Sequence, residues 1–166
     1  IDMDLIFDQF PSKIYPFDFE TYFNSDARCL LTVTNCLTGK AEYIEEKKNK
    51  RRMMEAVRAS SSLPFVSPMV YIDGKPMMDG GLTDSVPVQK AVRDGYKYNI
   101  VICTRPKGYR KKEGRPGKSV KLARKVYKKY PMLVKALAQR NRRYNREMEW
   151  IEKMEAKGRV FVIRPS

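Results

Sequence analysis

The segment that decides the fold is residues 59–88, which read ASSSLPFVSPMVYIDGKPMMDGGLTDSVPV. A helical pattern over 48–60 ends within the first residues of this segment. The apolar run 69–72 is typical of a strand. Asp73-Gly74 indicates a type I′ hairpin turn that leads into a second strand. Because proline lacks the N–H that an inner strand needs, Pro76 predicts that this second strand lies at a sheet edge or that the proline is its first residue.

A carboxylate followed by two glycines, Asp79-Gly80-Gly81, comes next. A carboxylate at the end of a strand in an α/β sheet is a frequent position for an active-site residue. The glycines permit a tight turn and let a ligand or a second backbone approach closely. Taken alone, the tripeptide is also typical of an ordinary turn.

Outward from this segment, apolar runs alternate with helical patterns. The strands predicted there lie at 29–35 (buried), 41–45 (paired with it after a turn at 38–40), 99–104 (buried) and 159–163. Helices are predicted at 86–95, at 119–129, and from Pro131 to Gly158. This alternation indicates an α/β domain with a covered sheet.

The last helix carries one apolar stripe with spacings of 4, 7, 4 and 3 residues. It consists of Leu133, Leu137, Tyr144, Met148 and Ile151. Four arginines lie mostly off that stripe, namely Arg140, Arg142, Arg143 and Arg146.

The composition excludes several classes of site. The 166 residues contain no histidine, which excludes Ser-His-Asp and Cys-His catalysis and histidine-based zinc sites within the chain. No run approaches the length of a membrane helix, and Cys29, Cys36 and Cys103 are interpreted as buried small hydrophobes in a reducing compartment. We therefore expect a cytoplasmic protein. Because the chain begins with Ile1 instead of methionine, we also expect a longer natural protein.

The charge is concentrated in the second half. Residues 1–95 carry 12 basic and 14 acidic side chains, a net of −2, whereas residues 96–166 carry 22 and 5, a net of +17. The cluster indicates an anionic partner: nucleic acid, a membrane surface or a polyanionic protein. It is equally compatible with a solvated surface. The basic residues expected to contact an anion or a membrane are Arg105, Lys107, Arg110, Lys111, Lys112 and Lys118.

The wider segment resembles the second signature of the patatin-like phospholipase family. The matching elements are Ala59-Ser60, Leu63-Pro64, the hairpin at Asp73-Gly74, Asp79-Gly80-Gly81 and Val86-Pro87. The strand Leu30–Asn35 followed by Thr38-Gly39 is also similar to the family's upstream strand and turn. The resemblance covers about residues 28–104 and is loose over 105–166.

This resemblance implies a three-layer α/β/α sheet, incomplete in this chain, and an acyl-ester (lipid or phospholipid) hydrolase. Asp79 would be the acid of a Ser-Asp dyad, with room for substrate beside Gly80 and Gly81, and no metal or cofactor is implied. The chain would be the C-terminal portion of a single domain. Residues 1–104 would hold the sheet and the motif, and 105–166 a basic helical extension with the last strand.

The family's nucleophile motif, Gly-x-Ser-x-Gly, is not found in the sequence. The nearest match, residues 117–121, has Lys121 at its last position and follows Asp79 instead of preceding it. A P-loop is excluded because Lys112 stands where that motif needs glycine. We therefore expect a fragment that is inactive alone and contacts membranes peripherally. The alternatives are a degenerate relative without activity, and a non-catalytic basic module that binds nucleic acid or anionic membrane. Beside Asp79, lipid headgroups are the more coherent anion, so nucleic acid is not the expected partner.

Overall fold

The computed structural model describes residues 2–114 and 117–165. Ile1, Arg115, Pro116 and Ser166 lie outside the described residues. The expectation of a longer natural protein rests on Ile1 and so also falls outside them. In chain order the elements are η1 (Leu5–Ile14, a π-helix), α1 (Phe19–Asn24), β1 (Leu31–Asn35), β2 (Lys40–Ile44), α2 (Lys50–Ser60), β3 (Val70–Ile72), β4 (Lys75–Asp79), η2 (Gly80–Leu82, one 3-10 turn), α3 (Val88–Arg93), β5 (Asn99–Ile102), α4 (Lys118–Val126), α5 (Pro131–Ala156) and β6 (Val160–Ile163). The predicted strands and helices are thus confirmed, with ends shifted by a few residues.

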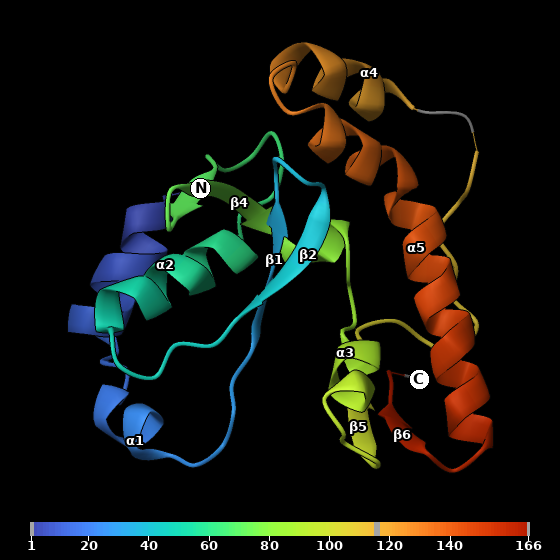
Figure 1. The fold of residues 1–166 in the computed structure, drawn as a ribbon, viewed down its shortest axis with the longest axis horizontal. Helices are drawn as coiled ribbons and strands as arrows, with labels where there is room; N and C mark the ends of the chain where they lie inside the picture. Colours follow the sequence, from blue (N-terminus) through green and yellow to red (C-terminus); the bar gives the residue numbers. More distant parts are fainter. Residues whose placement is uncertain (1, 115–116, 166) are drawn as a thin grey trace.

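A four-stranded antiparallel sheet forms the centre of the first half, in the order β2-β1-β4-β3 (Figure 1). The predicted type I′ hairpin joins β3 to β4, because both turn residues, Asp73 and Gly74, have positive φ (51° and 74°). Asp79, the last residue of β4, pairs with Val33 of β1. The carboxylate of the motif therefore lies at the end of an inner strand.

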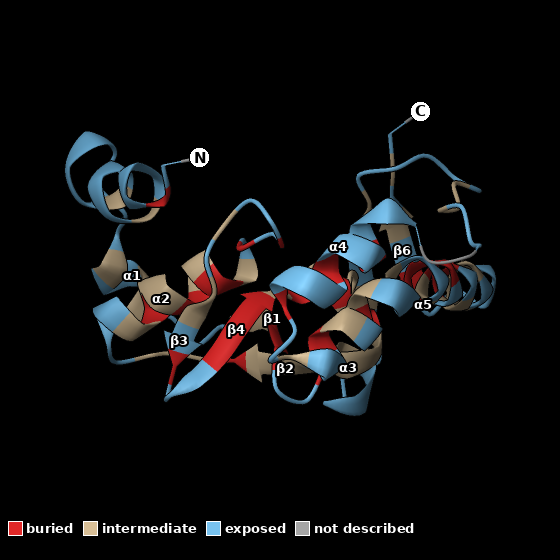
Figure 2. Ribbon diagram, turned by 90° about the horizontal axis from the view of Figure 1, so that it is seen from above, coloured by how far each residue is buried: buried red, intermediate tan, exposed pale blue. Residues whose placement is uncertain are grey.

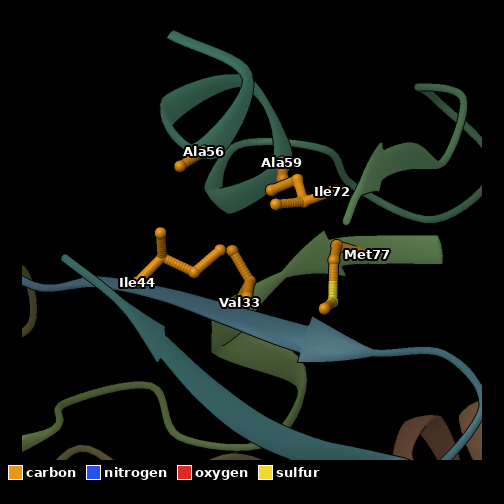
Figure 3. Close-up of a cluster of buried hydrophobic side chains, with 6 residues drawn as sticks. All are labelled: Val33, Ile44, Ala56, Ala59, Ile72 and Met77. Carbon is orange, nitrogen blue, oxygen red and sulfur yellow. The ribbon is translucent and has the colours of Figure 1, made fainter. Parts of the chain in front are cut away.

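Helices cover both faces of this sheet. Successive residues of β4 point to opposite faces, so neighbouring residues of this strand pack against different helices. Met77 packs with Val33 and Ile72 under Ala56 and Ala59 of α2 (Figure 3). Met78 packs on the opposite side in a second buried cluster, which includes Ala123 of α4 and Leu133 of α5. Figure 2 shows the resulting buried band along β1 and β4. The α/β class is confirmed.

The prediction for Pro76 is wrong, because β4 is an inner strand and Pro76 is its second residue. Cys36 donates its N–H to the carbonyl of Pro76 at 2.9 Å, but proline has no N–H to return the bond. The β1–β4 ladder accordingly ends at the neighbouring pair Asn35–Met77. Pro76 is tolerated inside the sheet because it lies where β1 stops.

A second, two-stranded sheet pairs β5 with β6 in parallel. Val101 and Val160 pack against α5 in a third cluster with Met148 and Ile151. The other side is exposed, so the prediction of a buried strand over 99–104 is wrong: Ile100 and Ile102 are 72% and 73% exposed, and Phe161 is 66% exposed. No described element covers that face.

Helix α5 links the two sheets, because its first turns pack against the four-stranded sheet and its last turns against β5–β6 (Figure 1). It starts with Pro131 in the first turn, a position where proline's missing N–H costs nothing. Over the residues that the structure describes, no helix combines the length and apolarity needed to cross a bilayer.

Candidate functional site

Asp79 is fixed by three hydrogen bonds. Its N–H donates to the carbonyl of Ser62 at 2.9 Å, and its carbonyl accepts from the hydroxyl of the fully buried Thr34 at 2.8 Å. The side-chain Oδ1 accepts from the N–H of Gly81 at 2.6 Å and so caps the short helix η2. Oδ2 makes no hydrogen bond within the described part of the chain. One carboxylate oxygen is therefore anchored, and the other is available to a ligand or a second catalytic group.

The two glycines of the motif are needed for different reasons. A Cβ added at Gly80 would overlap the backbone carbonyl of Thr32 on β1, so only glycine lets η2 lie this close to the sheet. A Cβ added at Gly81 would lie 3.0 Å from Oδ1 of Asp79 and crowd the carboxylate. The predicted close approach of the backbone is confirmed at Gly80.

Helix α5 packs against η2 and brings Glu147 to the segment that follows it. Glu147 accepts a hydrogen bond from the N–H of Ser85 at 3.1 Å. Burial, and then the nearby carboxylate of Asp84, raise the pKa of Glu147 to about 7, while the N–H groups of Ser85 and Val86 oppose the shift. Asp84 itself accepts a hydrogen bond from the Tyr43 hydroxyl. Sequence reasoning missed Glu147; its only signal is a spacing of seven residues from Arg140 on one helix face.

Of the predicted basic contacts, Lys111 is the one that the structure brings to this site. Asn145 holds its backbone on both sides, accepting from the Lys111 N–H at 2.8 Å and donating to the Lys111 carbonyl at 2.9 Å. Nζ of Lys111 lies 4.0 Å from the centroid of the Tyr144 ring. Burial and then Arg140 lower the pKa of Lys111, whereas Glu147 and Asp79 act in the opposite direction. Lys111 is therefore within electrostatic reach of Asp79.

The other predicted basic residues are spread out. Arg110 forms a two-pronged ion pair with Glu152 of α5, with its shorter contact at 2.6 Å. The guanidinium carbon of Arg105 lies 5.2 Å from the ring centroid of Tyr109. Lys107, Lys112 and Lys118 are exposed.

The expectation that the arginines of α5 lie mostly off its buried stripe is wrong for Arg140 and Arg143. Both are partly buried, whereas Arg142 and Arg146 are exposed. The reason is that α5 is covered on a wider arc than the apolar stripe alone, since η2 and the 110–113 segment also pack on it.

The serines near the motif have structural roles. Ser60 donates to the carbonyl of Thr32 on β1 at 2.8 Å, and Ser62 to the carbonyl of Arg58 at 2.8 Å. Ser60, the last residue of α2, thus ties the helix to β1, and Ser62 bonds back to the last turn of the helix. Ser119 lies in the first turn of α4. Within residues 2–114 and 117–165, no group of three or more Cys, Asp or Glu side chains is arranged to hold a metal ion.

A cleft of about 980 Å³ opens between the loop after α2 and the two C-terminal helices. We call it the 63–66 cleft, after Leu63–Val66 on one wall; the other wall includes Val120, Leu137 and Arg140. It begins one residue beyond Ser62, whose carbonyl is bonded to Asp79. Phe65, with φ of 69°, is held at the cleft by the Tyr127 hydroxyl, which accepts its N–H at 2.8 Å.

The sequence matches known protein families over two separate parts of the chain. Residues 10–92, half of the chain, match the family described as patatin-like phospholipase, and residues 130–166 match a domain of unknown function, DUF6363. The chain is 30% identical over 124 residues to the uncharacterized protein YjjU of Escherichia coli (strain K12), an alignment that covers 70% of this chain. The chain spans about a third (32%) of the length of that relative.

Proposed function

This chain belongs to the patatin-like phospholipase family, which is a family of lipid hydrolases, and from that premise we propose that Asp79 is the acid of a Ser-Asp catalytic dyad. The serine would come from another part of a longer protein, as is consistent with the share of YjjU that the chain spans. The substrate would be an acyl ester of a lipid. On this proposal the 166 residues alone have no ester hydrolase activity.

The observation that carries this proposal is that the two carboxylate oxygens of Asp79 differ in their hydrogen bonding. Oδ1 is tied to the Gly81 N–H, and the backbone of Asp79 is tied to Ser62 and Thr34. A carboxylate held in this way presents Oδ2 in one direction, which is what a general base needs in order to meet a serine hydroxyl at about 2.6–3.2 Å.

The chemistry follows the requirements of ester cleavage. Oδ2 of Asp79 accepts the proton of the serine hydroxyl while the serine oxygen bonds to the ester carbonyl carbon, and the proton then passes to the departing alcohol. In the second half, Asp79 takes a proton from water as the water oxygen bonds to the acyl carbon. The bond between the serine oxygen and the acyl carbon then breaks, the fatty acid leaves, and Asp79 passes the proton to the serine oxygen. No step requires an imidazole, so the absence of histidine is compatible with this reaction.

The test is Asp79→Asn in the full-length protein. We expect ester hydrolysis, followed with a chromogenic fatty-acyl ester, to fall by about 10²–10⁴-fold, because the amide cannot accept the serine proton. Asp73→Asn is the matched control: Asp73 lies at the exposed hairpin turn with φ of 51°, which asparagine tolerates, and this variant should keep full activity. Undiminished turnover by a folded Asp79→Asn variant would refute the proposal.

We also propose that the protein is cytoplasmic and contacts anionic membranes peripherally. Helix α4 supports the membrane contact: it exposes Lys121, Arg124 and Lys125 beside Leu122 and Val126, which are 49% and 54% exposed. Basic and apolar side chains on one short helix suit the interface of an anionic bilayer. The free thiols of Cys29, Cys36 and Cys103 are consistent with a reducing compartment.

A further inference from the structure

Glu147 of α5 contacts the segment that directly follows the Asp79 turn. Its Oε2 accepts a hydrogen bond from the N–H of Ser85 at 3.1 Å, and the N–H of Val86 acts on the same carboxyl group. Helix α5 itself packs against η2. A carboxyl group from the C-terminal part of the chain is thereby connected to the backbone beside the Asp-Gly-Gly motif.

Two further hydrogen bonds continue this contact to the carboxylate of Asp79. The Ser85 hydroxyl donates to the carbonyl of Gly81 at 2.9 Å, and the Gly81 N–H donates to Oδ1 of Asp79 at 2.6 Å. Gly81 is thus held by both of its backbone polar groups. A shift of Ser85 would therefore be passed to Gly81 and would turn the carboxylate of Asp79, including its second oxygen, Oδ2.

The four-stranded sheet anchors the same turn at two other points. The hydroxyls of Thr34 on β1 and Thr83 are hydrogen-bonded to each other at 2.8 Å. Strand β2 adds the second anchor, since the Tyr43 hydroxyl donates to the carboxylate of Asp84. Glu147 supplies the contact that α5 adds to these two.

The surroundings of Glu147 fit a positioning role better than a charge-pairing role. Within residues 2–114 and 117–165, Glu147 forms no ion pair. Burial and then Asp84 raise its pKa to about 7, so the charged form is disfavoured at this position. Strongly perturbed carboxyl groups concentrate at functional sites. What the structure uses is the ability of Glu147 to accept from the Ser85 backbone.

Glu147 lies outside the segment that matches the phospholipase family. That match covers residues 10–92, whereas Glu147 lies in the match to DUF6363, residues 130–166. The hydrogen bond between Glu147 and Ser85 therefore joins the two matched parts of the chain.

We propose that Glu147 is a positioning residue for Asp79, so that the DUF6363 part of the chain completes the active site of the phospholipase part. This inference rests on the proposed function. Glu147 acts through Ser85 and Gly81 and not by contact with the substrate. Because a catalytic group displaced by about 1 Å can cost about 10²-fold in rate, a contact of this kind matters for turnover.

The test compares variants of α5 in the full-length protein, with a chromogenic fatty-acyl ester as substrate. Glu147→Ala removes the acceptor for the Ser85 N–H, and we expect kcat to fall about ten- to hundredfold while KM stays within about twofold. Glu147→Gln keeps an oxygen that can accept, so its kcat should lie within about twofold of wild type. Glu149→Ala, exposed on the same helix, is the matched control and should change neither constant. Wild-type kcat in a folded Glu147→Ala variant, or a Glu147→Gln variant as slow as Glu147→Ala, would overturn the proposal.

Ser85→Ala tests the next link and replaces Glu147→Ala if that variant does not fold. It removes the hydroxyl that donates to the Gly81 carbonyl and leaves the N–H that bonds Glu147. We expect kcat to fall about three- to tenfold, the effect of one hydrogen bond. Ser61→Ala is the matched control, because the exposed Ser61 hydroxyl makes the same kind of bond, to the carbonyl of Val57 at 3.1 Å. Equal kcat in the two serine variants would also overturn the proposal.

Hydrogen exchange separates this inference from the proposed function. Mass spectrometry of a peptide that covers residues 79–88 should show faster exchange in Glu147→Ala than in wild type, and wild-type exchange in Glu147→Gln and Glu149→Ala. Unchanged exchange in Glu147→Ala would overturn the inference even if Asp79→Asn abolishes hydrolysis. Faster exchange together with a fully active Asp79→Asn variant would refute the proposed function, with the contact of Glu147 intact.

Discussion

At the scale of single residues, the site depends on the absence of a side chain at Gly80. Its added Cβ would meet the backbone of Thr32, which cannot move without shifting β1. We expect Gly80→Ala to lower the free energy of unfolding by about 1–3 kcal/mol, as overpacking does. Urea unfolding measures this, with Gly114→Ala as the control because a Cβ there meets no atom within 4 Å. Equal stability of the two variants would show that η2 does not sit as close to β1 as described.

Glu147 makes stability depend on pH. Asp84, Arg143 and Lys111 face its carboxyl group, and its pKa rises from an ordinary 4.5 to about 7. The native state therefore holds this proton more tightly than the unfolded chain. The resulting contribution to stability is complete below pH 4.5 and is lost as the pH rises to about 7.

The expected result is that Glu147→Gln unfolds with a flatter pH dependence between pH 4.5 and 7 and gains stability relative to wild type at pH 8. Urea unfolding at pH 5 and pH 8 measures the difference, and exposed Glu149→Gln is the control. A Glu147→Gln variant with the wild-type slope would contradict the shifted pKa.

At the scale of elements, Asn145 joins the basic loop to α5. Its buried amide bonds the N–H and the carbonyl of Lys111 and also Glu113, the last at 2.7 Å. We expect Asn145→Ala to leave buried backbone groups unpaired, to cost about 1–3 kcal/mol, and to make the 105–114 segment a faster target for trypsin. Asn141→Ala is the control, since exposed Asn141 makes one such bond, to Lys112. Equal cleavage rates would mean that Asn145 does not anchor the loop.

Local elements could be predicted from the sequence because their causes are local. The Asp73-Gly74 turn needs only two residues with positive φ, and the position of Asp79 at a strand end follows from the glycines after it. The prediction for Pro76 is wrong because the tolerance of a proline there depends on where β1, a strand distant in sequence, comes to an end at Asn35. The partners of Asp79, Thr34 and Ser62, also depend on that sheet order.

The partial burial of Arg140 and Arg143 could not be predicted for a similar reason. The periodicity of α5 describes its apolar stripe, but η2 and the 110–113 segment also pack on this helix, and no pattern in α5 encodes those contacts. For strand β5 the prediction errs in the opposite direction. Its apolar sequence is typical of a strand buried on both faces, yet the described residues cover only the face that carries Val101.

At the scale of the whole molecule, the charge asymmetry predicts how the protein meets membranes. We expect binding to vesicles that contain phosphatidylglycerol, measured by sedimentation, to weaken as salt is raised, and binding to neutral phosphatidylcholine vesicles to be weak. Reversing Lys121, Arg124 and Lys125 on α4 to Glu should abolish it, since each basic residue near the surface contributes about 1 kcal/mol.

The matched control reverses the exposed lysines Lys13, Lys40 and Lys75 in the first half of the chain, which should leave vesicle binding nearly unchanged. Salt-sensitive binding to duplex DNA with no affinity for anionic vesicles would contradict the membrane proposal and favour the nucleic-acid module instead.

The pairing of β5 with β6 has a consequence for synthesis on the ribosome. The four strands of the first sheet are complete once residue 79 has been made, so they can pair early. Strand β5 must wait until residues 160–163 follow, across the whole of α4 and α5. A nascent chain stalled near residue 150 would therefore carry a finished first sheet and an unpaired apolar strand, the kind of segment that chaperones hold.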